Sequence, residues 1–525
     1  MAVEQVLIAG KWRNANAKST FRAEDPATGT ALEGEFPVSE WPDCDDALTA
    51  AAAVAKELRS VPAETLANFL ELYAKKIEEN AAALVERAQA ETGLPIAPRL
   101  RDAELPRTAT QLRQGAAAAG DGSWAHAIID TKANIRSHFA PIGPVVIMGP
   151  NNFPFAFNGV SGGDMTAAIA TGCPVIAKAH PLHPGTSKLL AQCAVAALAE
   201  AGLPPATVQM LYHIGNQDGL RLVADPRVGA TSFTGSRGGG LALKAAADKA
   251  GKPIYLEMSS LNPVVLLPGA LAERGDQLAT ELIDSCLAAA GQMCTSPNLI
   301  LAIAGDHTER LAADLVGLLE KRPPAPMLSA AGLDGLHQSV RALVDAGAEV
   351  VAGAERASGE GYRYKNTLLR VSAAQFLAEP ERLQREAFGN ATMLVIADDA
   401  VQLQQAIAAL EGNLTGSIYS STTGGDYDDA LYAAIAAELR FKVGRLLDDK
   451  VPTGVALSPA MNHGGPYPAT GHPGFTAVGI PASLVRFAAL QCYDNVRPYR
   501  LPAALQDKSP NPAMWRQIDG AWVRG

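Results

Sequence analysis

A cysteine that follows an apolar helical stretch is the first residue of this sequence that could do chemistry. Leu278–Ala290 is apolar at helical spacing, and Gly291-Gln292-Met293-Cys294-Thr295 follows it directly. Gly291 permits a tight backbone turn, and the polar residues after Cys294 would make a poor apolar wall. The chain has six cysteines, most of which we expect to be buried small hydrophobes. Cys294 is placed instead to act as a thiolate nucleophile.

A glutamate and an asparagine pair at the ends of apolar runs could assist that nucleophile. Glu257 lies just before a second apolar run, where a carboxylate must be paired or lie near water that it can deprotonate. Asn151 and Asn152 follow the predicted strand Val145–Met148. At the carboxyl end of such a strand, an asparagine amide can donate to a developing oxyanion. A surface glutamate and a plain turn are the alternatives that these residues leave open.

A glycine-rich segment after another predicted strand suits a diphosphate. Phe233-Thr234-Gly235-Ser236 is followed by Gly238–Gly240 and a helical pattern. Backbone N–H groups at the start of a helix bind anionic groups. The first strand is not followed by GxGxxG, so the common dinucleotide fingerprint is missing.

The elements that must position these residues alternate between strand and helix. Short apolar runs at 144–148, 174–177, 208–212 and 229–233 are bounded by Gly and Pro, with helical patterns between them. A second unit of the same kind begins near Pro263 and runs past 394–397, whereas 44–93 is helical throughout. This alternation predicts an α/β fold with parallel strands joined by crossovers.

Composition excludes several classes of protein. The chain has 525 residues, 48% of them hydrophobic, and 44 Lys and Arg against 54 Asp and Glu give a formal charge of −10. Because no basic block is present, nucleic acid and membrane are not expected as partners. No apolar stretch approaches the ~18 residues of a membrane span and no secretory signal is seen, so we expect a cytoplasmic protein. The cysteines lack CxxC spacing and nearby histidine pairs, so no metal site is expected.

Taken together, the motifs resemble the aldehyde dehydrogenase superfamily over nearly the whole chain. The motifs in matching order and approximate spacing are Asn152-Phe153-Pro154, Lys178, Phe233-Thr234-Gly235-Ser236, Leu256-Glu257, Gly291-Gln292-x-Cys294 and Glu386-Ala387-Phe388-Gly389. Residues 178–187, 236–240 and 460–466 are similar to the branch of α-ketoglutaric semialdehyde and bacterial NADP-dependent fatty aldehyde dehydrogenases. One departure is Ser259-Ser260, where the family usually has Gly-Gly.

The resemblance implies an aldehyde dehydrogenase-like α/β fold in three parts. A Rossmann-type cofactor-binding domain would comprise residues 1–125 and 142–257, and an α/β catalytic domain residues 258–465. A small β oligomerisation element would comprise 126–141 and 484–500. Its strand-like runs, 128–139 and 484–496, could pair between subunits or form local hairpins. A homodimer or homotetramer is expected.

The resemblance also assigns catalytic roles. Cys294 would attack the aldehyde carbon, and the Asn152 amide and the Cys294 backbone N–H would hold the oxyanion. Hydride transfer to the nicotinamide then leaves a thioester. A water deprotonated by Glu257 would hydrolyse this thioester and release the acid.

Cofactor binding is assigned by the same matched positions. Lys178 would reach the adenosine ribose, Ser236 the diphosphate and Glu386 the nicotinamide ribose. The remaining expected cofactor-binding residues are His180, Pro181, Gly235 and Phe388. Pro181 stands where NAD-preferring relatives usually carry a glutamate that repels a 2′-phosphate, so NADP is favoured over NAD. Asn216-Gln217-Asp218 offers no arginine to hold that phosphate.

The expected substrate is a small aldehyde. Arg107 and Gln111 lie four residues apart on one face of a predicted helix, which in the family lines the substrate entrance. Facing inward, Arg107 would bind a carboxylate and favour an acidic semialdehyde such as 2,5-dioxopentanoate; a solvated surface arginine is the alternative. Phe157 and Thr295 complete the expected substrate-binding set. His463 is either a structural loop residue or lies near the cofactor or the tunnel mouth.

Other functions stay open at this point. A broad aliphatic or fatty aldehyde dehydrogenase would have the same motifs without needing Arg107. A CoA-acylating enzyme is disfavoured by Glu257. A noncatalytic dinucleotide-binding protein would not need Cys294, Asn152 and Glu257 together.

Overall fold

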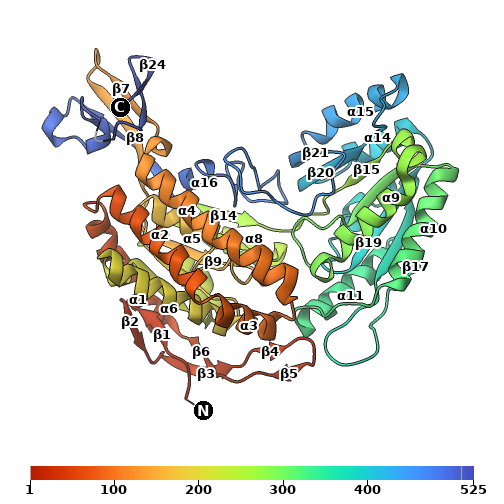
Figure 1. The fold of residues 1–525 in the computed structure, drawn as a ribbon, viewed down its shortest axis with the longest axis horizontal. Coiled ribbons are helices and arrows are strands. Elements are labelled where there is room, and N and C mark those ends of the chain that lie inside the picture. The colour runs from red at the N-terminus through yellow and green to blue at the C-terminus, as the bar shows by residue number, and fades with distance from the viewer. Residues whose placement is uncertain (1, 510) are drawn as a thin grey trace.

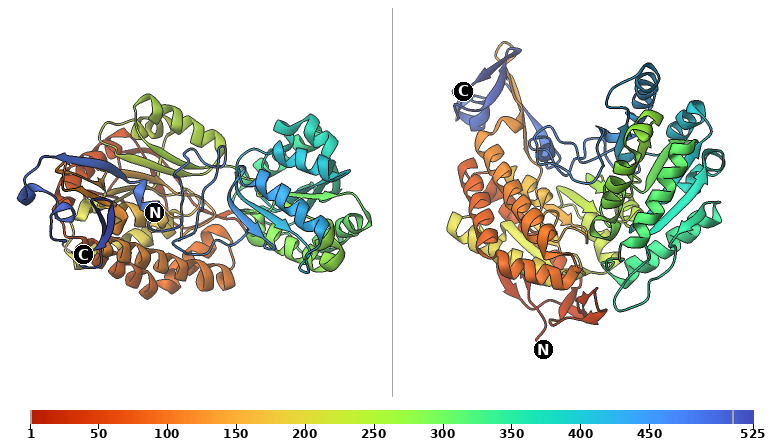
Figure 2. Two further views of the ribbon diagram at one scale, coloured as in Figure 1. Left: turned by 90° about the horizontal axis from the view of Figure 1, so that it is seen from above. Right: turned by 45° about the vertical axis from the view of Figure 1, so that its right-hand side comes forward.

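Two mostly parallel sheets form the centres of two lobes in the computed structural model, which describes residues 2–509 and 511–525 (Figures 1 and 2). In the first sheet, β1 runs antiparallel to both of its neighbours. The first sheet has the strand order β14-β13-β9-β10-β11-β1-β2. Every residue of β9 (Val145–Met148) and β11 (Val208–Leu211) is buried, because helices cover both faces of such a sheet. The other strands are β1 (Val6–Ile8), β2 (Lys11–Arg13), β10 (Val175–Lys178), β13 (Ala230–Thr234) and β14 (Ile254–Glu257).

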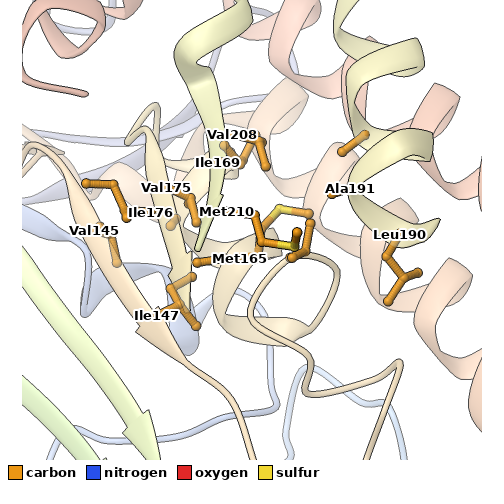
Figure 3. Packing of buried hydrophobic residues seen from close by; sticks show 14 of the residues in the cluster. Val145, Ile147, Met165, Ile169, Val175, Ile176, Leu190, Ala191, Val208 and Met210 are labelled. Atoms are coloured by element: carbon orange, nitrogen blue, oxygen red, sulfur yellow. The ribbon is translucent and has the colours of Figure 1, made fainter. Parts of the chain in front are cut away.

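The core of this lobe is built from aliphatic strand residues and two crossover helices. Figure 3 shows strand residues such as Val145 and Met210 near Met165 and Ile169 of α5 (Gly163–Ala170) and Leu190 of α6 (Pro184–Ala201). The other helices of the lobe are α1 (Trp41–Leu58), α2 (Ala63–Glu79), α3 (Ala81–Thr92), α4 (Leu105–Asp121), α7 (Asn216–Val223) and α8 (Arg237–Lys249).

The second lobe repeats this architecture. Its sheet has the order β17-β18-β19-β16-β15-β20-β21, and only β17 runs antiparallel to its neighbour among the described strands. The strands are β15 (Val264–Leu266), β16 (Leu299–Ile303), β17 (Glu349–Ala352), β18 (Thr367–Ser372), β19 (Ala391–Ala397), β20 (Asn413–Tyr419) and β21 (Val443–Asp448). The helices are α9 (Pro268–Leu287), α10 (Asp306–Lys321), α11 (Ala330–Asp345), α12 (Ala373–Ala378), α13 (Pro380–Leu383), α14 (Ala400–Ala408) and α15 (Asp426–Leu439).

A five-stranded arm projects from the first lobe, at the upper left of Figure 1. Its order is β22-β8-β7-β23-β24, with bounds β7 (Ala127–Asp130), β8 (Ile135–Pro141), β22 (Ala488–Asp494), β23 (Trp515–Ile518) and β24 (Ala521–Arg524). The predicted strand 484–496 was wrong at its start, where α16 (Ala482–Val485) forms a helical turn. Pairing of this arm with another subunit stays a prediction.

Sequence patterns missed the short strands around the first lobe and at the end of the chain. A three-stranded sheet joins β3 (Ala17–Phe21), β6 (Phe36–Ser39) and β12 (His213–Ile214), and β4 (Glu24–Asp25) pairs with β5 (Thr30–Ala31). Within the described residues no helix has both the length and the apolarity that crossing a bilayer requires.

Candidate active site

The candidate site lies where the carboxyl edge of the first sheet faces the amino edge of the second. In register, Met148 of β9 is beside Lys178 of β10 and Phe233 of β13, and Thr234 is beside Glu257. These strands therefore deliver Asn152, Lys178, Gly235 and Glu257 to one edge. From the other lobe, Cys294 precedes β16 and Glu386 precedes β19. All six residues line one cavity of about 710 Å³.

A strained turn presents Cys294 to this cavity. α9 ends at Leu287, and the next residues form a 3₁₀ turn in which Ala289, Ala290 and Gly291 have φ of 51°, 55° and 69°. A β-carbon on Gly291 would lie 2.1 Å from the carbonyl oxygen of Gly389, so only glycine fits. Left-handed backbone at alanine is strained, and such strain often marks a functional site.

Asn262 holds the backbone of the cysteine segment from the other side. Its amide Nδ2 donates to the carbonyl oxygens of Cys294, at 2.9 Å, and Ser296, at 2.8 Å. Thr295 and Ser296, which are polar and make a poor apolar wall, are nevertheless buried, each 1% exposed. Burial is tolerated in part because the Ser296 hydroxyl donates to Gly291 O at 2.9 Å.

Three reactive side chains meet at one ring nitrogen. Cys294 Sγ lies 3.4 Å from His463 Nε2, and the same nitrogen lies 3.4 Å from Glu257 Oε1. The side chains of His463 and Glu257 are 1% and 3% exposed. The backbone of His463 is fixed by hydrogen bonds to the Thr476 hydroxyl and the Ala477 N–H. Sequence reasoning weighed His463 mainly as a loop residue, and the structure places it against the cysteine.

Burial and the nearby carboxylate keep the cysteine protonated at rest. Desolvation, with the Glu257 charge second, raises the pKa of the Cys294 thiol well above its usual value. A thiolate therefore forms only when the thiol proton passes to a neighbouring base. His463 Nε2 and Glu257 Oε1 are the two acceptors positioned for this transfer.

Asn152 is tied to the cysteine turn through its amide. Nδ2 donates to the carbonyl oxygen of Gln292 at 2.9 Å, two residues before Cys294. A side-chain amide has a second N–H, so this contact orients Asn152 while leaving one donor.

A buried ion pair clamps the segment that carries Asn152. The Glu104 carboxylate accepts the N–H groups of Phe155, at 2.8 Å, and Ala156, at 3.0 Å. Arg99 bonds Glu104 at 2.5 Å and donates to Asn152 O at 3.0 Å. Its guanidinium also lies over the Phe153 ring, 4.4 Å from the centroid. This clamp fixes residues 152–156 from one side.

A second group of residues lies between Cys294 and α4. Arg107 lies 5.9 Å from the centroid of the Phe157 ring, which lies 5.9 Å from the His463 ring. Arg107 also donates to Val455 O. Among the described residues its Nε and Nη2 are buried without a hydrogen-bond partner. Gln111 is 3% exposed, and its amide contacts Ala156 O at 3.4 Å.

Residues 452–455 cover this group and are held by a further arginine. Arg445 donates to Gly454 O at 3.1 Å and Pro452 O at 2.7 Å. This part of the chain follows β21, where it crosses between the lobes (Figure 1). Arg107 and Arg445, from different lobes, thus bind the same short loop.

Comparison with known proteins decides the family. A sequence profile of the aldehyde dehydrogenase family matches residues 12–431. The chain belongs to the aldehyde dehydrogenase family. It is 39% identical to α-ketoglutaric semialdehyde dehydrogenase 2 of Azospirillum brasilense over 516 residues, 96% of this chain and 97% of that protein. It is 34% identical to α-ketoglutaric semialdehyde dehydrogenase of Acinetobacter baylyi, over 89% of each chain.

Solved structures of aldehyde dehydrogenases share the fold. The structure of 3,6-anhydro-L-galactose dehydrogenase in complex with NAP matches with a TM-score of 0.80 at 20% identity, over 94% of this chain and 99% of that one. Lactaldehyde dehydrogenase matches with a TM-score of 0.80 at 22% identity, over 93% and 98%. The predicted α/β fold and the predicted family are confirmed, and the chain is an oxidoreductase.

The residues of the cavity fit the dinucleotide that the sequence leads us to expect. Ser236 caps α8, accepting the Gly239 N–H at 3.3 Å, and the exposed Gly235 precedes it. Helix N-termini of this kind accept a diphosphate. A β-carbon on Gly235 would lie 2.7 Å from the Phe233 ring, so a side chain would crowd this turn. Expected residues that line the cavity are Lys178, His180, Gly235, Ser236, Glu386 and Phe388, while Pro181 and Thr295 are outside the described lining.

Burial shifts the pKa of several residues that line the cavity. It lowers the pKa of Lys178 to about 8 and that of His180 well below its usual value. Burial raises the pKa of Glu386 to about 7, against hydrogen bonds from Ser259 and Ser260 that lower it. At neutral pH, Lys178 therefore carries a positive charge and Glu386 is only partly ionised.

Proposed function

We propose that this aldehyde dehydrogenase oxidises a small acidic semialdehyde, with 2,5-dioxopentanoate as the preferred substrate, to the carboxylic acid. The observation that carries the proposal is Arg107, whose guanidinium is buried near the cysteine with two nitrogens left unpaired among the described residues. A buried guanidinium stays charged and binds a carboxylate through paired hydrogen bonds. Two relatives of 39% and 34% identity named as α-ketoglutaric semialdehyde dehydrogenases support the same substrate class.

The residues around Cys294 suit thioester chemistry. His463 or Glu257 would accept the thiol proton as the sulfur attacks the aldehyde carbon. The second N–H of the Asn152 amide and the Cys294 backbone N–H would hold the oxyanion that forms. A nicotinamide, when bound, supplies the hydride acceptor. Glu257 would then deprotonate the water that hydrolyses the acyl-cysteine.

The cofactor we propose is NADP in preference to NAD. Pro181 stands where a glutamate would repel the 2′-phosphate of NADP. Lys178, which lines the cavity with His180, supplies a positive charge. Ser236 and the start of α8 would bind the diphosphate, Glu386 the nicotinamide ribose, and Gly235 and Phe388 would shape the cavity. We further propose that residues 1–125 and 142–257 form the cofactor-binding unit and that residues 258–465 form the catalytic unit. Residues 126–141 and 484–500 would form the oligomerisation unit.

A matched pair of aldehydes tests the substrate. We expect kcat/KM to be higher for 2,5-dioxopentanoate than for pentanal, which has the same chain length but lacks the carboxylate and the 2-oxo group. Arg107→Gln should lower kcat/KM about 10- to 100-fold for the acid, as expected for a lost charge-assisted hydrogen bond, and leave pentanal little changed.

The control for that variant lies on the same helix. Arg113 is 41% exposed and pairs with Glu78 on the surface, so Arg113→Gln should affect neither aldehyde. Equal kcat/KM values for the two aldehydes in the unmodified enzyme would contradict the acidic substrate and favour a broad aliphatic aldehyde dehydrogenase.

A further inference from the structure

The contact between Cys294, His463 and Glu257 does not have the geometry of a proton relay. In a nucleophile–histidine–carboxylate triad, the nucleophile and the carboxylate bond to different nitrogens of the ring. Here Cys294 Sγ and Glu257 Oε1 both approach Nε2, each at 3.4 Å. One nitrogen carries at most one proton, so it cannot serve both neighbours at once. The arrangement therefore has a different use available to it.

Three sulfur, nitrogen or oxygen ligands that converge on one point, with a fourth position open, are typical of a zinc site that binds water. The sulfur, nitrogen and carboxylate oxygen lie within 4.8 Å of one another. With Zn–S of about 2.3 Å and Zn–N and Zn–O of about 2.0 Å, tetrahedral geometry separates S from N by about 3.5 Å and N from O by about 3.3 Å. The two observed separations of 3.4 Å match those edges.

We infer that Cys294, His463 and Glu257 form a binding site for one Zn²⁺ ion, and that the bound ion blocks aldehyde oxidation. The block, but not the binding, rests on the proposed role of Cys294 as nucleophile. Thiolate, imidazole and carboxylate are the ligands that zinc takes, whereas Mg²⁺ and Ca²⁺ prefer sites made only of oxygen. A fourth position stays free for a water.

Three further observations support the site. Glu257 is 3% exposed, and its second oxygen, Oε2, is buried without a hydrogen-bond partner among the described residues. A positive ion would stabilise this carboxylate in place of the missing partner. Cys294 and Glu257 line the large cavity, which gives an ion an access path. His463 is held in place through its backbone, so the ligands are already close together.

The binding step balances as a simple exchange. The ion forms bonds to sulfur, nitrogen and oxygen, and the Cys294 thiol loses its proton to solvent. No group is oxidised or reduced. Because coordination withdraws charge from the sulfur and so lowers its nucleophilicity, and because a zinc-bound Glu257 can no longer accept a proton from water, both steps assigned to these residues stop together. Removal of the ion by a chelator restores them.

Metal binding is measured without aldehyde or cofactor, so its result does not depend on the proposed function. The metal-free full-length protein is titrated with Zn²⁺ in competition with a chromophoric zinc indicator, and then with Co²⁺ to reveal a thiolate-to-metal charge-transfer band. We expect one ion per chain. His463→Asn should weaken zinc binding by at least about tenfold, because removing a ligand costs more than removing an outer-shell partner, and Cys294→Ser should abolish the cobalt band.

Matched controls and an unmutated sample keep the test decisive. Cys492 and His472 are exposed, so Cys492→Ser and His472→Asn should bind zinc like the parent protein. Parent protein alkylated at Cys294 should lose the cobalt band without any substitution. Unchanged zinc affinity in His463→Asn, a cobalt band that survives loss or alkylation of Cys294, or the absence of stoichiometric binding would each overturn the site. Chelator-reversible loss of aldehyde oxidation in the parent enzyme then tests the block.

Discussion

The two ends of the candidate site are built differently. The end proposed for the cofactor rests on strand ends: Lys178 ends β10, Glu257 ends β14, and Gly235 directly follows β13. The end proposed for the aldehyde rests on α4 and on a loop that two arginines bind. Buried parallel strands fix the first end by their register. The second end depends on a few hydrogen bonds from side chains to loop carbonyls, so substrate preference can change there without disturbing the cofactor.

Substitution of Glu257, at the end of β14, should have the largest effect. Glu257→Gln keeps the side-chain shape but removes the base that activates water, so steady-state turnover should fall about 10²- to 10⁴-fold. Acylation of Cys294 should persist, so reduced cofactor is still expected from the first turnover. Glu320→Gln, at an exposed position, is the control. Unchanged steady-state rates in Glu257→Gln would remove this residue from the mechanism.

A smaller effect is expected from the ion pair between Arg99 and Glu104, which clamps residues 152–156. Glu104→Gln leaves Arg99 without its ion-pair partner and loosens residues 152–156. A misplacement of about 1 Å in Asn152 should lower kcat about 10- to 100-fold, with little change in KM for the cofactor. Asp102→Asn, on the surface nearby, should behave as the parent. A rise in cofactor KM with unchanged kcat would contradict this, because it would show that Glu104 supports cofactor binding and not the position of Asn152.

The smallest effect concerns the charge at the cofactor end. The pKa of Lys178 is lowered to about 8 by burial, so the lysine loses its charge as the pH rises through that value. The 2′-phosphate is then bound less well, and NAD, which lacks this phosphate, is affected less. The ratio of KM for NADP to KM for NAD should rise about threefold to tenfold above pH 8. A flat ratio in the parent, or the same rise in Lys178→Gln, would contradict the assignment.

The same contrast explains what could be predicted from sequence. Fully buried parallel strands give continuous apolar runs, so β9, β10, β11 and β13 were found within a residue or two of their bounds. Strands such as β3 and β24 are short and largely exposed, so they lack a pattern. The residues at strand ends could be located for the same reason.

Residues whose importance depends on tertiary contacts were missed. Asn262 binds backbone groups that lie 32 or more residues away in the chain, and Glu104 binds backbone groups 51 or more residues away. Arg445 binds two carbonyl oxygens seven and nine residues away. No local pattern marks such a partner in advance. His463 lies 169 residues from Cys294 in the chain, so a single loop histidine could not be assigned to the cysteine. The segment 460–466, in which Gly464 and Gly465 follow His463, was a signal only through the family resemblance.

Trapping the acyl group on the enzyme tests the central claim most directly. Glu257→Gln protein is mixed with NADP and 2,5-dioxopentanoate, and reduced cofactor is measured together with the mass of the cysteine-containing peptides. We expect about one equivalent of reduced cofactor per chain and an acyl group on Cys294, because catalysis is covalent, and neither in the double variant with Cys294→Ala. Reduced cofactor formed by the double variant, or an acyl group on another residue, would contradict it.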